Sequence, residues 1–175
     1  MKNIQRKNIP VSKHVKKFLN YYFPEPYTLM PGDFLGTIFI VLFKKGYRTS
    51  VVKKAEACFQ INVKKNYLQR FGRVIPWENA VAFNKAIDDI FRKQLFNYMD
   101  LNRKLDKDFA KTSMVQFLEE MNITEDDINY DSLYREYKRK KNYPKTSFEM
   151  MGETIKKKIK NKMTDLSPKS DRFVP

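Results

Sequence analysis

Apolar residues recur at three- and four-residue spacing in several parts of the chain, the pattern of helices with one buried face. The clearest run begins after Pro76 and Trp77 and consists of Phe83, Ile87, Ile90, Phe91, Leu95, Tyr98 and Leu101. Glu78 precedes it and Arg103 and Lys104 follow it, which are the ends where a helix dipole favours these charges. The pattern predicts a long helix that forms the structural spine.

Two apolar runs earlier in the chain also predict helices. Ser12 is a favourable N-cap for a helix that ends at residues 23–26 and has one apolar face, formed by Val15, Phe18, Leu19 and Tyr22. Residues 33–45 predict a buried helix, with Asp33 as its cap and Gly46 as its C′ residue. A strand is the alternative for this second run, because an apolar run of this length does not determine the period.

The pattern changes to period two over residues 48–63, which is typical of a strand. One face carries Ala57, Phe59, Ile61 and Val63, and the other carries Cys58, Gln60 and Asn62. Residues 49–52 are a candidate partner strand, and residues 67–74, with a turn at Gly72, are a candidate third strand. The predicted fold is therefore mainly α with a small β-ribbon or sheet, an α+β class.

Residues 109–141 predict two or three helices joined by short turns. The first has an apolar face of Ala110, Met114, Phe117, Leu118 and Met121, stops at Asn122 and is followed by Ile123 as a buried turn residue. Residues 124–127 have the Thr-x-x-acid form of a capping arrangement. The last helix has an inner face of Tyr130, Leu133, Tyr134 and Tyr137, which leaves its cations on another side.

Residues 117–124, leading into residues 130–139, resemble the small basic helix-turn-helix proteins of phages and conjugative or other mobile elements. The resemblance implies that residues 134–141 enter or border the major groove of DNA and that the rest of the chain positions or dimerises this module. The linker, residues 125–129, is more acidic and longer than the usual tight turn. A solvated basic helix on a helical bundle gives a similar pattern and is the alternative.

These elements suggest three parts. Residues 1–105 are expected to form a helical body with the small β element, and residues 106–143 the helix-turn-helix-like module. Residues 144–175 are expected to form a basic C-terminal helix or tail, in which Ile155, Ile159 and Met163 make a thin apolar stripe among lysines.

The charge distribution indicates what kind of partner the chain binds. The chain has 35 Lys and Arg against 20 Asp and Glu, a formal charge of +15. The basic residues concentrate in residues 1–20, 47–75 and 135–175, whereas residues 76–134 carry seven bases against twelve acids. Such blocks favour a polyanion, with DNA first and RNA as a possibility. An acidic protein partner, or a basic surface that results only from AT-rich codon usage, is the alternative.

The residues predicted to contact nucleic acid are Lys13, Lys16, Lys17, Lys64, Lys65, Arg70, Arg73, Arg135, Lys138, Arg139, Lys140 and Lys141. Lysine neutralises phosphates, and arginine also pairs with guanine edges in the major groove. His14 lies in a basic stretch and is expected to be a surface or phosphate-contacting residue.

The sequence gives little support for a catalytic function. One His and one Cys cannot make a convergent metal or nucleophile site, and Cys58 is expected to be a small buried side chain on a strand. The acid pairs Asp88-Asp89, Asp106/Asp108 and Asp126-Asp127 have helix-surface and capping explanations. No glycine spacing matches a phosphate loop. We expect no enzyme activity, no metal and no cofactor.

The sequence shows no secretory signal pattern, and its one strongly apolar run, residues 34–43, is far shorter than a membrane span. A single cysteine fits a reducing compartment. A cytoplasmic protein without membrane contact is expected. It is predicted to be a sequence-specific or architectural DNA-binding protein of a phage or mobile element, with a regulatory or accessory role and possible homo-oligomers. The alternative is a structural or assembly protein of a virion or nucleoprotein complex, whose basic arms contact neighbouring subunits or genome.

Overall fold

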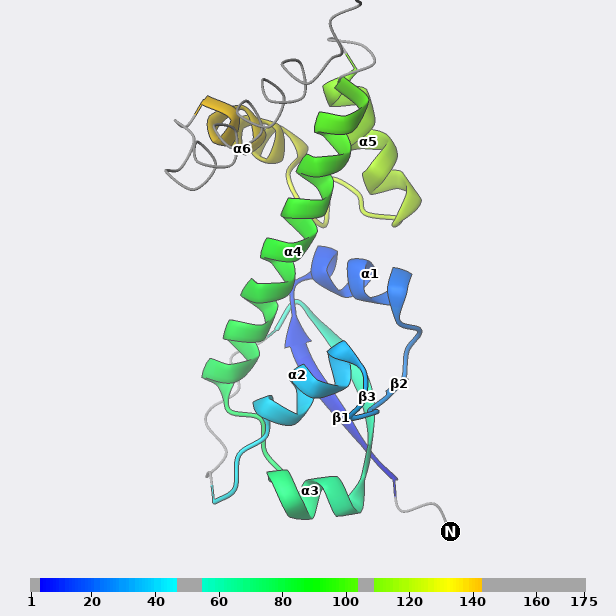
Figure 1. Ribbon diagram of the computed structural model, residues 1–175, viewed down its shortest axis with the longest axis vertical. Helices are drawn as coiled ribbons and strands as arrows, with labels where there is room; N and C mark the ends of the chain where they lie inside the picture. The colour runs from blue at the N-terminus through cyan, green and yellow to red at the C-terminus, as the bar shows by residue number, and fades with distance from the viewer. Residues whose placement is uncertain (1–3, 47–54, 104–108, 143–175) are drawn as a thin grey trace, which may run out of the picture. The chain divides into compact units, whose positions relative to one another are not determined.

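The computed structural model describes residues 4–46, 55–103 and 109–142 of the chain (Figure 1). By its internal contacts the chain divides into two units, Met1–Arg135 and Glu136–Pro175. The first unit contains almost all of the described structure. The predicted boundaries near residues 105 and 143 stay predictions.

The described residues form six helices and one three-stranded sheet, which confirms the predicted fold class, mainly α with a small sheet. In chain order the elements are β1 (Ile4–Val11), α1 (Lys13–Tyr22), β2 (Tyr27–Thr28), α2 (Phe34–Leu42), β3 (Ala57–Lys64), α3 (Lys65–Phe71), α4 (Trp77–Arg103), α5 (Ala110–Glu120) and α6 (Tyr130–Asn142).

β3 is the central strand of the sheet. β1 pairs with it in antiparallel register, with Ile9 opposite Phe59, and the two-residue β2 pairs with it in parallel. The predicted alternation of β3 is confirmed, because Phe59, Ile61 and Val63 are completely buried while Gln60 and Asn62 are half-buried. The sheet therefore has one apolar face and one polar face, as expected of a sheet covered from one side.

Three helices cover the apolar face. Phe39 of α2 stacks on Phe59 of β3 with ring centroids 6.1 Å apart, and Phe83 of α4 lies 5.2 Å from Phe39. From α1, Phe18 contacts the ring of Phe91 on α4 at 5.6 Å. Because truncating a buried Phe to Ala costs about 3–5 kcal/mol, this aromatic cluster supplies much of the stability of the first unit.

α4 is the predicted spine, and its 27 residues extend about 40 Å. Most of its apolar stripe is buried as expected, but Ile90 and Tyr98 are half-buried and Leu101 is 61% exposed. The N-terminal half of α4 packs near the sheet, and Phe117 of α5 contacts the C-terminal half at Phe91 and Tyr98, with centroids 6.3 and 5.5 Å apart. Figure 1 shows α5 beside this half of the helix.

The apolar run of residues 34–43 is a helix, so the strand alternative is wrong. The carboxylate of Asp33 caps α2 as predicted, accepting a hydrogen bond from the backbone N–H of Gly36 at 2.5 Å and another from Tyr27 Oη at 2.6 Å. The predicted end is wrong, because the backbone becomes extended at Phe43 and not at Gly46. Lys44 leaves the helix to form an isolated bridge with Val74.

Two further predictions are corrected. Residues 67–74 do not form a strand: residues 65–71 are the helix α3, in which Tyr67 and Phe71 contact one another across one turn, with centroids 6.3 Å apart. The strand β1 was not predicted, because Pro10 interrupts its pattern; proline is tolerated there since β1 lies at the edge of the sheet. The proposed strand at residues 49–52 lies outside the described residues.

Gly72 provides a test of how closely the end of α3 packs against Lys44. It follows α3 with φ 124° and ψ 166°, a region that is almost exclusive to glycine, and a Cβ there would lie 2.2 Å from the carbonyl carbon of Lys44. We expect Gly72→Ala to lower the free energy of unfolding by about 2 kcal/mol or more. Urea denaturation measures this change.

Gly32→Ala is the matched control, because a Cβ at Gly32 meets nothing within 4 Å and its φ is not positive. Its effect should stay within about 0.5 kcal/mol. Equal stability of the two variants would contradict the close approach of Gly72 to Lys44.

Candidate nucleic-acid interface

The predicted contact residues on α1 are used inside the protein more than the sequence suggests. Lys16 Nζ lies 3.3 Å from Glu25 Oε2, and Lys17 Nζ lies 2.5 Å from Asp127 Oδ2. Lys13 is exposed. Two of the three α1 cations therefore already have carboxylate partners, which makes this helix a weak candidate for phosphate contact.

Asp127 is held by several donors. The backbone N–H and the hydroxyl of Thr124 donate to the same Oδ2 that Lys17 contacts, at 2.8 and 2.9 Å. Burial opposes ionisation of Asp127, but these hydrogen bonds outweigh it and lower its pKa. The predicted capping arrangement of residues 124–127 is therefore present, but it closes a turn and does not begin a helix. α6 begins at Tyr130, and its cap is Asn129, whose Oδ1 accepts from Ser132 N at 2.8 Å.

A second group of cations gathers around α3. Lys64 and Lys65 lie where β3 passes into α3, and Arg70 and Arg73 lie at the other end of this short helix. The backbone N–H of Lys44 donates to Val74 O at 2.9 Å, so the segment after α2 runs beside the segment after α3. We call this set the basic end, and its members are Lys44, Lys45, Lys64, Lys65, Arg70 and Arg73.

All six cations of the basic end are exposed. Residues 34–46 and 57–77, which form this region, contain no Asp or Glu. Within the described residues none of the six side chains forms an ion pair. Arg70 instead lies over the ring of Phe71, 5.2 Å from its centroid. The positive charge of this region is therefore available to an anionic partner.

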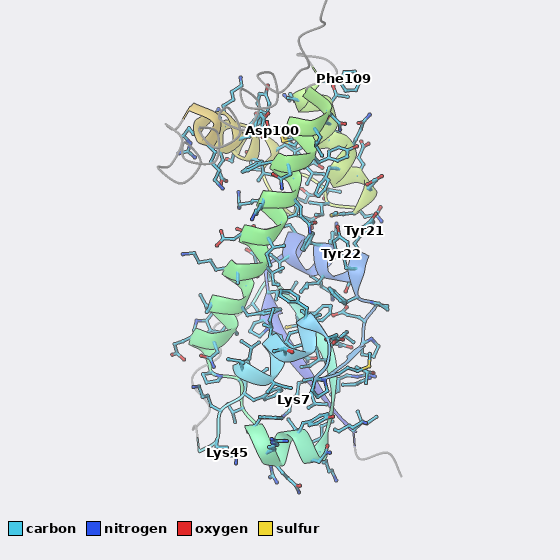
Figure 2. All side chains as sticks on the ribbon, viewed as in Figure 1. Lys7, Tyr21, Tyr22, Lys45, Asp100 and Phe109 are labelled. Carbon is cyan, nitrogen blue, oxygen red and sulfur yellow. The ribbon has the colours of Figure 1, made fainter. Side chains whose placement is uncertain are left out.

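Sequence reasoning identified Lys64, Lys65, Arg70 and Arg73 but missed Lys44 and Lys45. These two lysines follow an apolar run and lie just before the basic block that was counted from residue 47. The bridge between Lys44 and Val74 is what brings them to α3, and no local pattern reveals it. Figure 2 shows Lys45 at the α3 end of the unit.

α6 carries the rest of the predicted contact residues. Leu133 and Tyr137 are buried and Tyr130 and Tyr134 are half-buried, which confirms the predicted inner face. The remaining positions include the exposed residues Arg135, Lys138, Arg139 and Lys140. Lys140 Nζ forms an ion pair with Glu136 Oε1 at 3.0 Å, and the side chain of Lys141 lies outside the described set.

The connection from α5 to α6 runs over residues 121–129. Asn122 has φ 53°, its N–H donates to Glu119 O at 2.9 Å, and the N–H of Ile123 donates to Leu118 O at 2.8 Å. This is a Schellman termination, with Ile123 buried as predicted. Tyr130 Oη donates to Ile123 O at 2.6 Å. A DNA-binding helix-turn-helix has a turn of about 3–4 residues, so this well-ordered connection is longer than that geometry requires.

His14 is not the surface residue that its basic neighbourhood predicts. It is only 9% exposed, its ring lies 5.5 Å from that of Phe91, and its Nε2 is 2.8 Å from Asp88 Oδ1. Arg92 Nε donates to the other oxygen of Asp88 at 2.9 Å. Burial opposes ionisation of Asp88, but the hydrogen bonds from His14 and Arg92 prevail and lower the pKa of this carboxyl.

The described residues give little support for metal binding or catalysis. In the described segments no three His, Cys, Asp or Glu side chains come together in a way that would hold a metal ion. Cys58 is half-buried. A pocket of about 230 Å³ lies beside Ser12, Trp77 and Asn84, but Asn84 Oδ1 is occupied by the N–H and hydroxyl of Ser12, at 2.8 and 3.2 Å.

Among the described helices, none combines the length and apolar character that crossing a bilayer needs. Comparison of the chain with protein-family models, with curated proteins and with solved structures finds no match. The assignment of function therefore depends on the chemistry of the surface.

The Asp88 cluster gives a pH prediction. A carboxyl with a lowered folded-state pKa stabilises the protein above its unfolded value of about 4, and this contribution is lost as the pH falls through the folded value. Asp88→Asn should lower stability at pH 7 by about 1–3 kcal/mol, because His14 and Arg92 lose a charged acceptor. The difference from the native protein should shrink at lower pH.

Urea denaturation at neutral pH and at a series of acidic values measures this difference. Asp89→Asn is the matched control, because Asp89 is the exposed neighbour and should show almost no effect. A destabilisation by Asp88→Asn that stays constant down to the lowest pH would contradict the role given to this carboxylate.

Proposed function

We propose that this chain is a non-enzymatic, nucleic-acid-binding protein that holds DNA through its basic end. The observation that carries the proposal is the set of six exposed cations on one acid-free region, with no ion pair among them in the described structure. Cations that have no carboxylate partner inside the protein can displace counterions from a phosphate backbone.

The arrangement suits backbone contact better than base reading. Four of the six cations are lysines, which act as point charges on phosphates, and α3 has only seven residues. Six phosphate contacts would give an affinity that falls about a thousandfold between 50 and 200 mM salt. The basic end thus supports architectural or accessory binding.

α6 is proposed as a second contact, one that can add sequence preference. Arg135 and Arg139 lie one turn apart and are exposed on this 13-residue helix, and arginine is the side chain that pairs with guanine in the major groove. The proposed setting is the cytoplasm of a host cell, in a phage or mobile element, as the resemblance of residues 117–139 implies.

An assembly role is the second candidate, and a different observation favours it. α2 presents large apolar side chains to solvent, with Phe34 67% and Val41 70% exposed. Exposed apolar patches on monomers commonly mark protein contacts. A structural protein of a virion or nucleoprotein complex would use such a face together with the basic end.

Matched double variants test the DNA proposal. Lys64→Ala with Lys65→Ala should weaken binding to a short DNA duplex at least tenfold and make the slope of log affinity against log salt shallower by about two units. Lys85→Ala with Lys93→Ala removes the same charge from exposed positions of α4 and should have little effect. Fluorescence anisotropy at several salt concentrations measures both quantities.

Arg135→Ala with Arg139→Ala tests α6 in the same assay and should reduce affinity mainly for the preferred sequence. If the Lys64 and Lys65 pair behaves like the Lys85 and Lys93 pair, binding does not use the basic end. Affinity that hardly changes with salt would contradict the proposal for the whole protein.

A further inference from the structure

α2 has an apolar face that the described part of the chain leaves largely uncovered. Phe34, Ile38 and Val41 follow one another at helical spacing, and Phe34 and Val41 are 67% and 70% exposed. Met30, just before the helix, is 57% exposed. The nine residues of α2 include no charged side chain, and the hydroxyl of the one polar side chain, Thr37, is bonded to backbone carbonyls.

The charges beside this face limit what can cover it. Lys44 and Lys45 are exposed directly after α2, and residues 34–46 contain no acid. A matching surface therefore needs an apolar or aromatic centre with carboxylates next to it, because like charges across an interface would oppose binding.

The same chain carries such a surface at a different place. Tyr21 and Tyr22, at the end of α1, are 52% and 46% exposed (Figure 2). Glu119 and Glu120 are exposed at the end of α5. Burial, the neighbouring Tyr21 and the negative charge of Glu120 raise the pKa of Tyr22, which places this carboxylate near the tyrosines. We call this surface the tyrosine–acid patch; its members are Tyr21, Tyr22, Glu119 and Glu120.

The acids of this patch are placed unfavourably within one molecule. Glu119 and Glu120 lie at the C-terminal end of α5, where the helix dipole disfavours negative charge, and the last turn of α5 contains no basic residue. Cations supplied by another molecule would relieve this repulsion. Tyrosine rings also accept cations on their faces, and they pack against apolar side chains.

One molecule cannot bring its own two surfaces together. α2 is tied to the start of α4, because Asn79 Nδ2 donates to Leu42 O at 2.9 Å. The tyrosine–acid patch is tied farther along the same helix, because Tyr22 Oη donates to Gln94 Oε1 at 3.0 Å. Asn79 and Gln94 are about 22 Å apart along a straight helix, so each surface needs a second molecule.

We propose that copies of this chain associate head to tail, with the α2 face and Lys44 and Lys45 of one copy on the tyrosine–acid patch of the next. The two surfaces differ, so the contact is heterologous and can repeat from copy to copy. Apolar burial supplies attraction, and the opposite charges select this pairing and make it sensitive to salt.

Complementation between two variants tests this pairing. Phe34→Ser with Val41→Ser removes the α2 face but keeps the tyrosine–acid patch. Glu119→Lys with Glu120→Lys reverses the patch but keeps the α2 face. Sedimentation velocity on protein freed of nucleic acid by nuclease and high salt, then returned to low salt, gives the mass of each sample alone and of the equimolar mixture.

The native chain should form dimers and larger species as its concentration rises, and high salt should dissociate them. Each variant alone should remain monomeric. The mixture should form a species of twice the monomer mass and nothing larger, because only one intact pair of surfaces remains in it. Circular dichroism should show that both variants keep the native helix content, since all four changed residues are exposed.

Two control variants carry the same kinds of change elsewhere. Val81→Ser with Leu101→Ser replaces two other exposed apolar residues, and Glu56→Lys with Asp89→Lys reverses two other exposed acids. Both should associate as the native chain does.

Three results would overturn the proposal: a native chain that stays monomeric at every soluble concentration, a Glu119 and Glu120 variant that still forms dimers, or two monomeric variants whose mixture stays monomeric. Dimers of the Glu119 and Glu120 variant would instead indicate a symmetric contact between the α2 helices of two copies. None of these results depends on DNA binding, because the Phe34 and Val41 changes leave the charge of the basic end intact.

Discussion

The apolar face of a three-stranded sheet has to be buried by helices on one side, and this requirement organises the first unit. Phe59, Ile61 and Val63 have no exposed surface, because α1, α2 and α4 all lie on their side of β3. The helices in turn need each other, since Phe39 contacts both Phe59 and Phe83. Protein interiors are close-packed, so these few rings fix the relative positions of the helices.

This packing separates two kinds of cation. Several side chains on the packed helices have carboxylates nearby: Lys16 pairs with Glu25, Lys17 with Asp127, and Arg92 with Asp88. The cations of the basic end come from segments that contain no acid, so their charge faces solvent. A large net charge alone therefore says little about a binding surface. The useful quantity is the charge that remains after the folded chain has paired its own groups.

Local patterns predicted the elements whose signal is contained within a few residues. The alternation of β3, the apolar stripe of α4 and the cap at Asp33 were all readable, because each depends on neighbours in sequence. α3 was predicted as a strand because its seven residues bury only Leu68, which is too little apolar pattern to show a helical period. β1 was missed because only Ile9 and Val11 are buried in it, and Pro10 lies between them.

The candidate site was predictable only in part, for the same reason. Lys64, Lys65, Arg70 and Arg73 could be identified as a basic block, but Lys44 and Lys45 join them through a long-range bridge. His14 was misassigned because its partner, Asp88, is 74 residues away. The tertiary structure decides which cations form ion pairs. Nothing in the sequence near Lys17 indicates that its partner is Asp127.

Three side-chain partners of residues 12–17 come much later in the chain. Ser12 bonds to Asn84, His14 to Asp88 and Lys17 to Asp127, with the last pair 110 residues apart. During synthesis, at about 5–20 residues per second, this segment leaves the ribosome long before those partners exist. Residues 1–20 contain six Lys and Arg and no acid, so this segment carries unpaired positive charge until those partners are synthesised. Its docking on α4 is thus a late event in the life of each new molecule.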